Sequence, residues 1–352
     1  MLKIVITTLM LLTSTLSIPL SITPDYFLTT NVSVGSNNQN FTVQLDTGSL
    51  PLWINSESCK VVSKSSGDAP NGPCYGDNFD SSSSSTFQNL NTPFSISYDD
   101  GTEIKGKNVK DTFTIGNYRY DNFQFGLVDS ETYEDGDQSW TIGILGLTPK
   151  CCGDTQSSLI ESIFKDNSVQ NKLFTLYLPK DINQQGEMII GNYNTTGNIV
   201  WVPVTLEDEA WNFGSITLVG DSKTFKGIAD TGTDIMYMPS KTLKTLCKNL
   251  NMKFDKELGC YTACSNSKNI ANFILNFGNN IQLEINTQDN FIYPIDKYGD
   301  RTKNSDKCAL AIYGDKAKYG YTLGAAVLRQ FHTIWDFSNF NNLAGKIGFM
   351  KK

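Results

Sequence analysis

The sequence predicts an all-β fold, mostly β with a few short helices, in which two related β-rich lobes make up the chain. Two observations carry this prediction. Short apolar runs are separated by clusters of Gly, Asn, Asp and Ser at roughly ten-residue spacing, which is typical of sheet-rich folds. A short motif also occurs twice at matching positions, which indicates a duplication. A chain of 352 residues is long enough for two such units.

The apolar runs identify individual elements. Four runs that are flanked by turn-forming residues are the clearest strand candidates. These are Phe41–Leu45, Phe94–Tyr98, Met188–Ile190 and Ile199–Val204. The best helix candidates are Ser158–Phe164 and Ser240–Leu250, and the low-complexity run Ser81–Ser85 is expected to be an exposed loop.

The duplicated motif contains an aspartate in each half. An apolar strand leads into Asp-Thr-Gly-Ser, which begins at Asp46, and another leads into Asp-Thr-Gly-Thr, which begins at Asp230. Each half later has a Leu-Gly pair, whose glycine is Gly146 or Gly324. That glycine follows its aspartate by 100 residues in the first half and by 94 in the second. Ordered motifs at matched spacing predict two lobes of common design.

The first residues predict a secretory signal peptide at 1–17. A lysine precedes the apolar run Ile4–Leu12, and small residues then permit cleavage after Ser17. That run is too short to span a bilayer comfortably, and no later segment reaches that length, so we expect no membrane anchor. The expected N-terminal lobe is 18–195 and the expected C-terminal lobe is 196–352. The expected destination is the cell exterior or an acidic, lysosome-like vacuole.

Eight cysteines fit this oxidising route. A local bridge between the first two is favoured by their short separation, and the pairing of the last four is a weaker expectation among many possible connectivities. The expected disulfides are Cys59–Cys74, Cys247–Cys260 and Cys264–Cys308. The adjacent Cys151 and Cys152 have no assigned partners. Three Asn-x-Ser/Thr triplets are candidate glycosylation sites: Asn31, Asn40 and Asn194.

Composition excludes several kinds of function. The net charge of −7 does not favour nucleic-acid binding, which needs a basic face. His332 is the single histidine, so it would have to serve any Ser-His-Asp or Cys-His arrangement, and a residue within a strand is the simpler interpretation. A His-Glu-x-x-His zinc motif is impossible, and no cysteine pairs have zinc-finger spacing, so we expect no metal and no cofactor.

Two carboxylates are the remaining candidates for chemistry. If Asp46 and Asp230 face each other, two like charges at close range resist double ionisation, so the pair shares one proton and one apparent pKa rises. The ionised carboxylate can then take a proton from a bound water, while the protonated one polarises a substrate carbonyl. A lone Asp-Thr-Gly is best explained as a turn. Two copies at matching positions favour the paired-carboxylate interpretation.

The residues beside each aspartate fit that arrangement. Thr47 and Thr231 are expected to hydrogen-bond between the lobes. The neighbouring glycines allow backbone N–H groups to approach the carboxylates, and the hydroxyl residues that follow can donate to the outer carboxylate oxygens. These supporting residues are Gly48, Ser49, Gly232 and Thr233.

Here the chain resembles the pepsin family of two-lobed aspartic proteases, over nearly its whole length after the signal peptide. The matching pieces are Asp46-Thr-Gly-Ser49, Trp53-Ile54, Ser95-Ile-Ser-Tyr-Asp-Asp-Gly-Thr102, Ile144-Leu-Gly-Leu147, Val202-Pro-Val204, Asp230-Thr-Gly-Thr233, Leu323-Gly-Ala325 and Leu328-Arg-Gln-Phe331. The resemblance implies two lobes around a central cleft, one catalytic aspartate per lobe and a polypeptide substrate. The chain is expected to act as a monomer. The paired aspartates of this family are the established example of the shared proton.

A hairpin is predicted between the two strands around Tyr98. Apolar side chains alternate from Phe94, and Asp100-Gly101 offers a turn. Taken alone, Tyr98 would simply make a cross-strand pair. The resemblance implies instead a flap that closes over substrate, with Asp99 at its tip and Tyr98 bonded to Trp53.

The chain departs from the family pattern at several positions. Asp99 replaces the usual glycine after the flap tyrosine, Ala325 replaces an aspartate, and Asp234 adds a carboxylate near the second motif. Tyr26 and Phe27 already resemble the first mature strand, so no conventional inhibitory propeptide is expected. The alternative to an active endopeptidase is a catalytically inactive member of the fold that binds peptides or proteins. An aspartyl-phosphate phosphotransferase explains only one copy of the motif.

Overall fold

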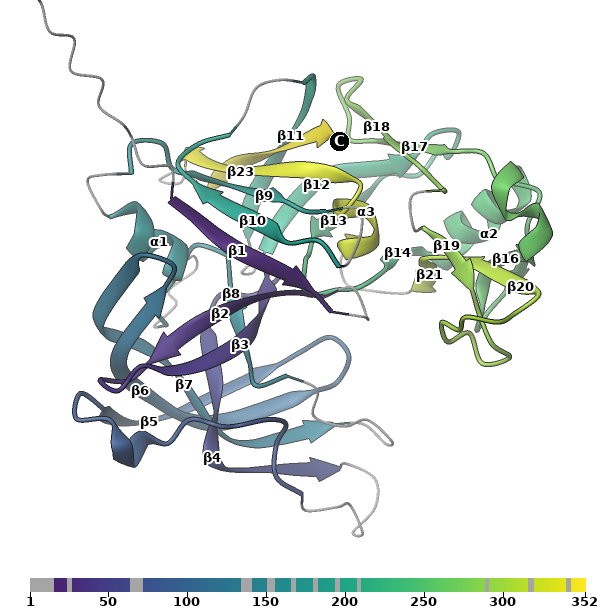
Figure 1. Ribbon diagram of the computed structural model, residues 1–352. Coiled ribbons are helices and arrows are strands. Elements are labelled where there is room, and N and C mark those ends of the chain that lie inside the picture. Colours follow the sequence, from purple (N-terminus) through teal and green to yellow (C-terminus); the bar gives the residue numbers. More distant parts are fainter. Residues whose placement is uncertain are drawn as a thin grey trace, which may run out of the picture.

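Figure 1 shows the computed structural model of the chain. It describes residues 16–23, 27–63, 72–133, 141–150, 156–165, 169–179, 183–193, 197–207, 210–288, 291–315, 320–339 and 343–352. Most of the predicted signal peptide, the pair Cys151–Cys152 and the candidate glycosylation site Asn194 lie outside the described residues. Asn31 and Asn40 are exposed, as glycosylation requires.

The N-terminal lobe is a sheet in which parallel and antiparallel pairs alternate around the first motif. Its strands are β2 (Leu28–Val34), β3 (Gln39–Asp46), β4 (Leu52–Ser63), β5 (Gln88–Ser97), β6 (Glu103–Ile115), β7 (Tyr118–Tyr133) and β8 (Gly143–Gly146). β3 runs parallel to β8, with Asp46 opposite Gly146. β4 lies antiparallel to β8 and parallel to β7. The Leu-Gly segment and the Asp-Thr-Gly segment of this lobe are therefore neighbours in space.

The C-terminal lobe repeats this arrangement. Its strands are β12 (Ala210–Leu218), β13 (Phe225–Ala229), β14 (Met236–Pro239), β17 (Phe273–Asn276), β18 (Gln282–Ile285), β21 (Ile312–Asp315) and β22 (Tyr321–Leu323). β13 runs parallel to β22, and β14 lies antiparallel to β22 and parallel to β21. A separate sheet contains β15 (Lys253–Asp255), β16 (Gly259–Ala263), β20 (Lys307–Leu310) and β19 (Ile292–Pro294). The duplication expected from the sequence is thus confirmed in the strand pairing.

A further set of strands joins the two lobes, and the sequence patterns did not predict it. These strands pair antiparallel in the order β1 (Leu16–Ile22), β10 (Gly186–Ile190), β9 (Leu173–Tyr177), β23 (Phe331–Asn339), β24 (Ala344–Lys351) and β11 (Ile199–Glu207). In Figure 1, β1 lies beside β10, and β9 and β23 follow on the other side of β10. The expected lobe boundary at 195/196 lies between β10 and β11, and the expected cleavage after Ser17 lies within β1. Both stay predictions.

Helices are few among the described residues, as expected. They are α1 (Leu159–Phe164), α2 (Ser240–Asn249) and α3 (Ala325–Leu328), with the 3₁₀ helices η1 (Ser81–Ser83) and η2 (Cys264–Asn269). Ser158 begins α1 by accepting a hydrogen bond from the Glu161 N–H, the usual role of a serine N-cap. The serine run was expected to be a loop, but η1 forms there because Asp80 accepts from the Ser82 N–H. None of the described helices has the length and apolar character needed to cross a membrane.

Aromatic packing fixes the strands that lead to the motifs. Trp211 on β12 lies opposite Ala229, the residue before Asp230, and packs against Phe337 with ring centroids 4.4 Å apart. Phe41 on β3 packs against Phe79 at 6.1 Å. The four aromatic side chains in these two pairs are buried, so large apolar surfaces hold β12 and β3 in place.

The structure contains disulfides Cys59–Cys74, Cys247–Cys260 and Cys264–Cys308. These are the pairings that the sequence favoured. The first closes a loop next to β4, and the other two tie α2 and η2 to the small sheet of the C-terminal lobe. Closing such loops restricts the unfolded chain, which stabilises the folded one.

Candidate active site

The two aspartates stand where parallel strand pairs end. Asp46 is the last residue of β3, and its carbonyl accepts a hydrogen bond from the Leu147 N–H at 2.7 Å. Asp230 follows β13, and its N–H donates to the Leu323 carbonyl at 3.1 Å. Each aspartate is therefore anchored by backbone bonds to the Leu-Gly segment of its own lobe.

Each carboxylate is bonded by the residues that follow it, in the same pattern. The Gly48 N–H donates to Asp46 Oδ1 at 2.7 Å, and Ser49 Oγ donates to Asp46 Oδ2 at 2.5 Å. In the second half the corresponding donors to Asp230 lie at the same distances. They are the Gly232 N–H at 2.7 Å and Thr233 Oγ1 at 2.5 Å. Such bonds orient each carboxylate.

The glycines allow the two carboxylates to face each other. A Cβ added at Gly48 would lie 2.6 Å from Asp230 Oδ1, and one added at Gly232 would lie 2.5 Å from Asp46 Oδ1. Real Cβ atoms do not approach other atoms so closely. Each glycine thus leaves room for the aspartate of the opposite lobe, which explains the residue type at both positions.

The threonines tie the two loops together across the lobes. The Thr47 N–H donates to Thr231 Oγ1 at 3.0 Å, and the Thr231 N–H donates to Thr47 Oγ1 at 2.9 Å. The two hydroxyls in turn donate to the carbonyls of Ala229 and Leu45, at 3.2 and 2.9 Å. Both threonines are fully buried, so no water competes for these bonds. This reciprocal bonding is the arrangement expected from the sequence.

Burial and proximity give Asp46 an unusual acidity. Burial is the largest cause that raises its pKa well above its ordinary value, and the negative charge and hydrogen bond of Asp230 raise it further. The bonds from Ser49 and Gly48 act in the opposite direction but do not outweigh these effects. The raised pKa favours the protonated form of Asp46 next to the second carboxyl group. The pair can supply an acid and a base at once.

A hairpin lies over this site from the N-terminal lobe. β5 and β6 pair from Ser97 opposite Glu103, and the turn between them closes with the Gly101 N–H donating to the Tyr98 carbonyl at 3.0 Å. The predicted contact is present, because Trp53 Nε1 donates to Tyr98 Oη at 2.7 Å. The pKa of Tyr98 is raised, first by burial and then by the charge of Asp46, which places its ring near the first aspartate.

The tip of this hairpin is acidic and exposed. Asp99 and Asp100 are both exposed, and Asp100 Oδ1 accepts from the Thr102 N–H at 2.8 Å. Gly101 has a φ of 89°, a left-handed conformation that glycine adopts without strain. The turn predicted from Asp100-Gly101 is therefore confirmed.

Two departures from the family pattern, Ala325 and Asp234, take part in backbone hydrogen bonds beside the second motif. Ala325 begins α3 fully buried, and its N–H donates to the Thr233 carbonyl at 2.7 Å. The Ala326 N–H likewise donates to the Asp234 carbonyl at 2.9 Å. The start of α3 thus supports the second loop through backbone bonds, which do not depend on the side chain at 325.

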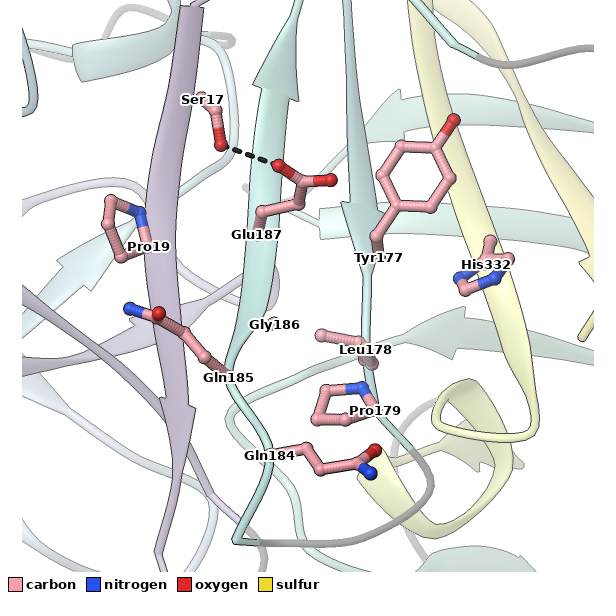
Figure 2. Close-up of a pocket in the computed structure, with 10 residues that line it drawn as sticks. All are labelled: Ser17, Pro19, Tyr177, Leu178, Pro179, Gln184, Gln185, Gly186, Glu187 and His332. Carbon is pink, nitrogen blue, oxygen red and sulfur yellow. Dashed lines mark hydrogen bonds between the residues drawn. The ribbon is translucent and has the colours of Figure 1, made fainter.

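A surface cavity of about 520 Å³ lies away from the aspartates, on the strands that join the lobes. Figure 2 shows its lining from β1, β10, β9 and β23, with Ser17 Oγ donating to Glu187 at 2.6 Å. His332 lies at one side of it, where burial lowers its pKa to about 4, and its ring is 4.8 Å from that of Tyr177. No residue of the two motifs belongs to the lining of this cavity, so the cavity is separate from the candidate active site.

Comparison with known proteins agrees with this geometry. The family model described as eukaryotic aspartyl protease matches residues 26–347. Chymosin from Camelus dromedarius is 30% identical over 325 residues, which cover 88% of this chain and 77% of that protein. Secreted aspartic protease 8 from Candida albicans is 27% identical, covering 89% and 73%. Pepsin-3 from Oryctolagus cuniculus is 27% identical, covering 90% and 79%.

The family match spans both Asp-Thr-Gly loops, the hairpin and, of the strands that join the lobes, β9, β10, β11 and β23. The two Asp-Thr-Gly motifs, Trp53, Tyr98 and the two Leu-Gly segments, which carried part of the resemblance, lie at or next to this site. The chain therefore belongs to the eukaryotic aspartyl protease family.

Proposed function

We propose that this protein is an aspartic endopeptidase that hydrolyses internal peptide bonds with Asp46 and Asp230. The observation that carries the proposal is the facing pair of carboxylates, in which burial and the charge of Asp230 raise the pKa of Asp46. Such a pair holds one proton in acid solution and can act as base and acid together. This chemistry needs no metal and no covalent intermediate.

The reaction follows from the bonding around the pair. The ionised carboxylate takes a proton from a water held between the two aspartates, and the water oxygen attacks the peptide carbonyl carbon. The protonated carboxyl gives its proton to the carbonyl oxygen, so a neutral tetrahedral diol forms. A proton then passes from the pair to the amine as the C–N bond breaks, and a diol hydroxyl returns a proton to the pair as the carbonyl forms again. Ser49 and Thr233 hold the outer oxygens, which keeps the inner oxygens aimed at the water.

The hairpin is proposed to close over the substrate as a flap. Its tip residues Asp99, Asp100 and Gly101 would meet an extended polypeptide, and the Trp53–Tyr98 bond would hold the flap in register with Asp46. Excluding water in this way strengthens the electrostatic interactions within the site. Asp99 carries a side chain where the family pattern usually has glycine. We propose that the flap contacts the substrate through backbone groups at that position, so the contact does not depend on the side chain.

The test is cleavage of denatured haemoglobin by the recombinant protein between pH 3 and pH 7. We expect cleavage that is strongest in acid, that pepstatin blocks, and that Asp46→Ala abolishes. Activity should fall as the pH rises through the raised pKa of Asp46, because the pair then loses its proton. Cleavage that persists in Asp46→Ala would contradict the proposal.

The alternative is a catalytically inactive member of the family that binds peptides. The intact bonding around both carboxylates favours the enzyme, because peptide binding alone does not require two carboxylates oriented toward each other. Binding of pepstatin without cleavage at any pH, by protein with a cooperative thermal transition, would favour this alternative.

We infer that the protein enters the secretory pathway and works outside the cell or in an acidic vacuole, as a monomer. Three disulfides among the described residues require an oxidising compartment during folding. One relative is itself described as a secreted aspartic protease. We also propose that the chain divides into a signal peptide (1–17), an N-terminal lobe (18–195) and a C-terminal lobe (196–352). Both lobes contribute to the strands that join them.

A further inference from the structure

The strand before the first motif carries a polar side chain where the strand before the second carries an apolar one. Gln44 lies two residues before Asp46 on β3, and Ile228 lies two residues before Asp230 on β13. Gln44 is 1% exposed and Ile228 is 6% exposed, so both side chains are buried. A buried carboxamide is unfavourable unless its donors and acceptors are paired. Gln44 therefore requires an explanation that Ile228 does not.

The Gln44 side chain makes a hydrogen bond that crosses between the lobes. Its Nε2 donates to the Gly232 carbonyl at 3.2 Å. Its Oε1 is buried and has no hydrogen-bond partner among the described residues. The carboxamide is thus only partly satisfied and lowers folding stability relative to an apolar side chain of the same shape. The benefit of retaining it must lie in the bond to Gly232.

Gly232 is well placed to control the spacing of the two carboxylates. Its N–H donates to Asp230 Oδ1 at 2.7 Å, so a movement of this residue moves the second aspartate. Its Cα faces the first aspartate, because an added Cβ would lie 2.5 Å from Asp46 Oδ1. A bond from β3 to the Gly232 carbonyl therefore fixes the second loop relative to the strand that ends at Asp46.

We propose that Gln44 is a positioning residue that holds the Gly232 peptide group and thereby sets the separation of Asp46 and Asp230. This inference rests on the proposed endopeptidase function. The threonine bonds hold both loops equally, whereas the Gln44 bond acts on the second loop alone, since the apolar side chain of Ile228 has no donor for Gly48. The two halves of the site are thus held asymmetrically.

The test compares Gln44→Met with Ile228→Met. Methionine keeps the approximate length and volume of glutamine but removes the hydrogen-bond donor. Ile228→Met places the same side chain at the equivalent position of the other lobe without removing an interlobe bond. Active-site titration with pepstatin gives the concentration of folded enzyme in each preparation. Steady-state cleavage of one peptide substrate, over a range of pH, then gives kcat and KM per active site.

For Gln44→Met we expect kcat to fall about 10-fold with KM within about twofold, because misplaced reacting groups lower the rate more than binding. The alkaline limb of the pH profile should move to lower pH, because carboxylates held less closely repel less and the pKa of Asp46 falls. The thermal midpoint should be equal to that of the wild type or higher, because the partly unpaired carboxamide is removed from the core. Ile228→Met should match the wild type in kcat and pH profile.

A purely structural role predicts other outcomes. The inference is overturned if titrated Gln44→Met retains the wild-type kcat and pH profile, or if Ile228→Met shows the same losses. If the wild-type protein itself cleaves no substrate while Gln44→Met is equally well folded, the proposed function fails first and this inference with it. If the wild-type protein cleaves substrate and Gln44→Met has the same kcat and pH profile, only the positioning role of Gln44 is refuted.

Discussion

The two Asp-Thr-Gly loops are nearly identical in their bonds but differ in what surrounds them. In each, a glycine N–H and a hydroxyl donate to the aspartate at 2.7 and 2.5 Å. The first loop lies beneath the Tyr98 hairpin and is preceded by Gln44. The second is preceded by Ile228 and supported by the start of α3. The shared bonds orient the carboxylates in the same way, whereas the contacts around the two loops differ between the lobes.

The two lobes share their strand pairing around the motifs and differ in the segments added to it. Strand pairing around each motif is the same, down to the parallel pair that ends at the aspartate. The longer additions differ, since the hairpin of β5 and β6 belongs to the first half and the small sheet of β15, β16, β20 and β19 belongs to the second. We infer that symmetric residues should give equal effects when changed, and that the asymmetric ones should not.

The largest effect should come from filling the space between the carboxylates. Gly48→Ala and Gly232→Ala each place a Cβ within 2.6 Å of the opposing aspartate, so each should lower kcat by about 100-fold or more. The two losses should be similar, because the clashes are equivalent. Measurement of kcat per folded molecule, with folding checked by thermal unfolding, tests this.

The matched control is Gly214→Ala on β12. A Cβ added at Gly214 meets no atom within 4 Å, so its kcat should equal that of the wild type. A loss in only one of the Gly48 and Gly232 variants would break the symmetry of the site, and would show that one lobe adjusts to the clash by moving.

A smaller effect is expected from the threonines. Thr47→Val and Thr231→Val keep the side-chain shape, but each removes two hydrogen bonds and leaves buried backbone groups unpaired. Each should lower the free energy of unfolding by about 2–4 kcal/mol. Urea denaturation at pH 5 measures the two values, and a difference of more than about 1 kcal/mol between them would contradict equivalent roles.

The symmetric features are also the ones that the sequence could predict. Asp-Thr-Gly-Ser and Asp-Thr-Gly-Thr specify their own bonds, because the hydroxyl, glycine and carboxylate interact within four residues. The reciprocal bonds of Thr47 and Thr231 followed from the repeat itself. The turn at Asp100-Gly101 and the helices at Ser158 and Ser240 were likewise predicted from local patterns.

The features that the sequence did not reveal depend on distant pairing. The strands joining the lobes come from both ends of the chain, and an apolar run such as Met188–Ile190 does not state which strand it will pair with. Helix α3 is too short for a periodic pattern. Gln44 left a detectable signal, a polar residue between Val43 and Leu45 in a buried strand, but its partner in the other lobe could be identified only from the fold.

The smallest expected effect concerns Asp46 itself and is seen in how the free energy of unfolding depends on pH. The folded-state pKa of Asp46 is raised above its ordinary value of 3.8, so between these two pKa values the folded protein binds more protons than the unfolded one. Its stability therefore falls as the pH rises from about 4 through the raised pKa. Asp46→Asn removes this titration.

The stability of Asp46→Asn relative to the wild type should then increase with pH. The gain should be about 1.4 kcal/mol for each unit by which the folded pKa exceeds the unfolded one. Urea midpoints at pH 3.5 and pH 6.5 measure it, and the lost Ser49 bond adds an offset that is the same at both. Parallel pH curves for the two proteins would mean that Asp46 is ionised in the fold.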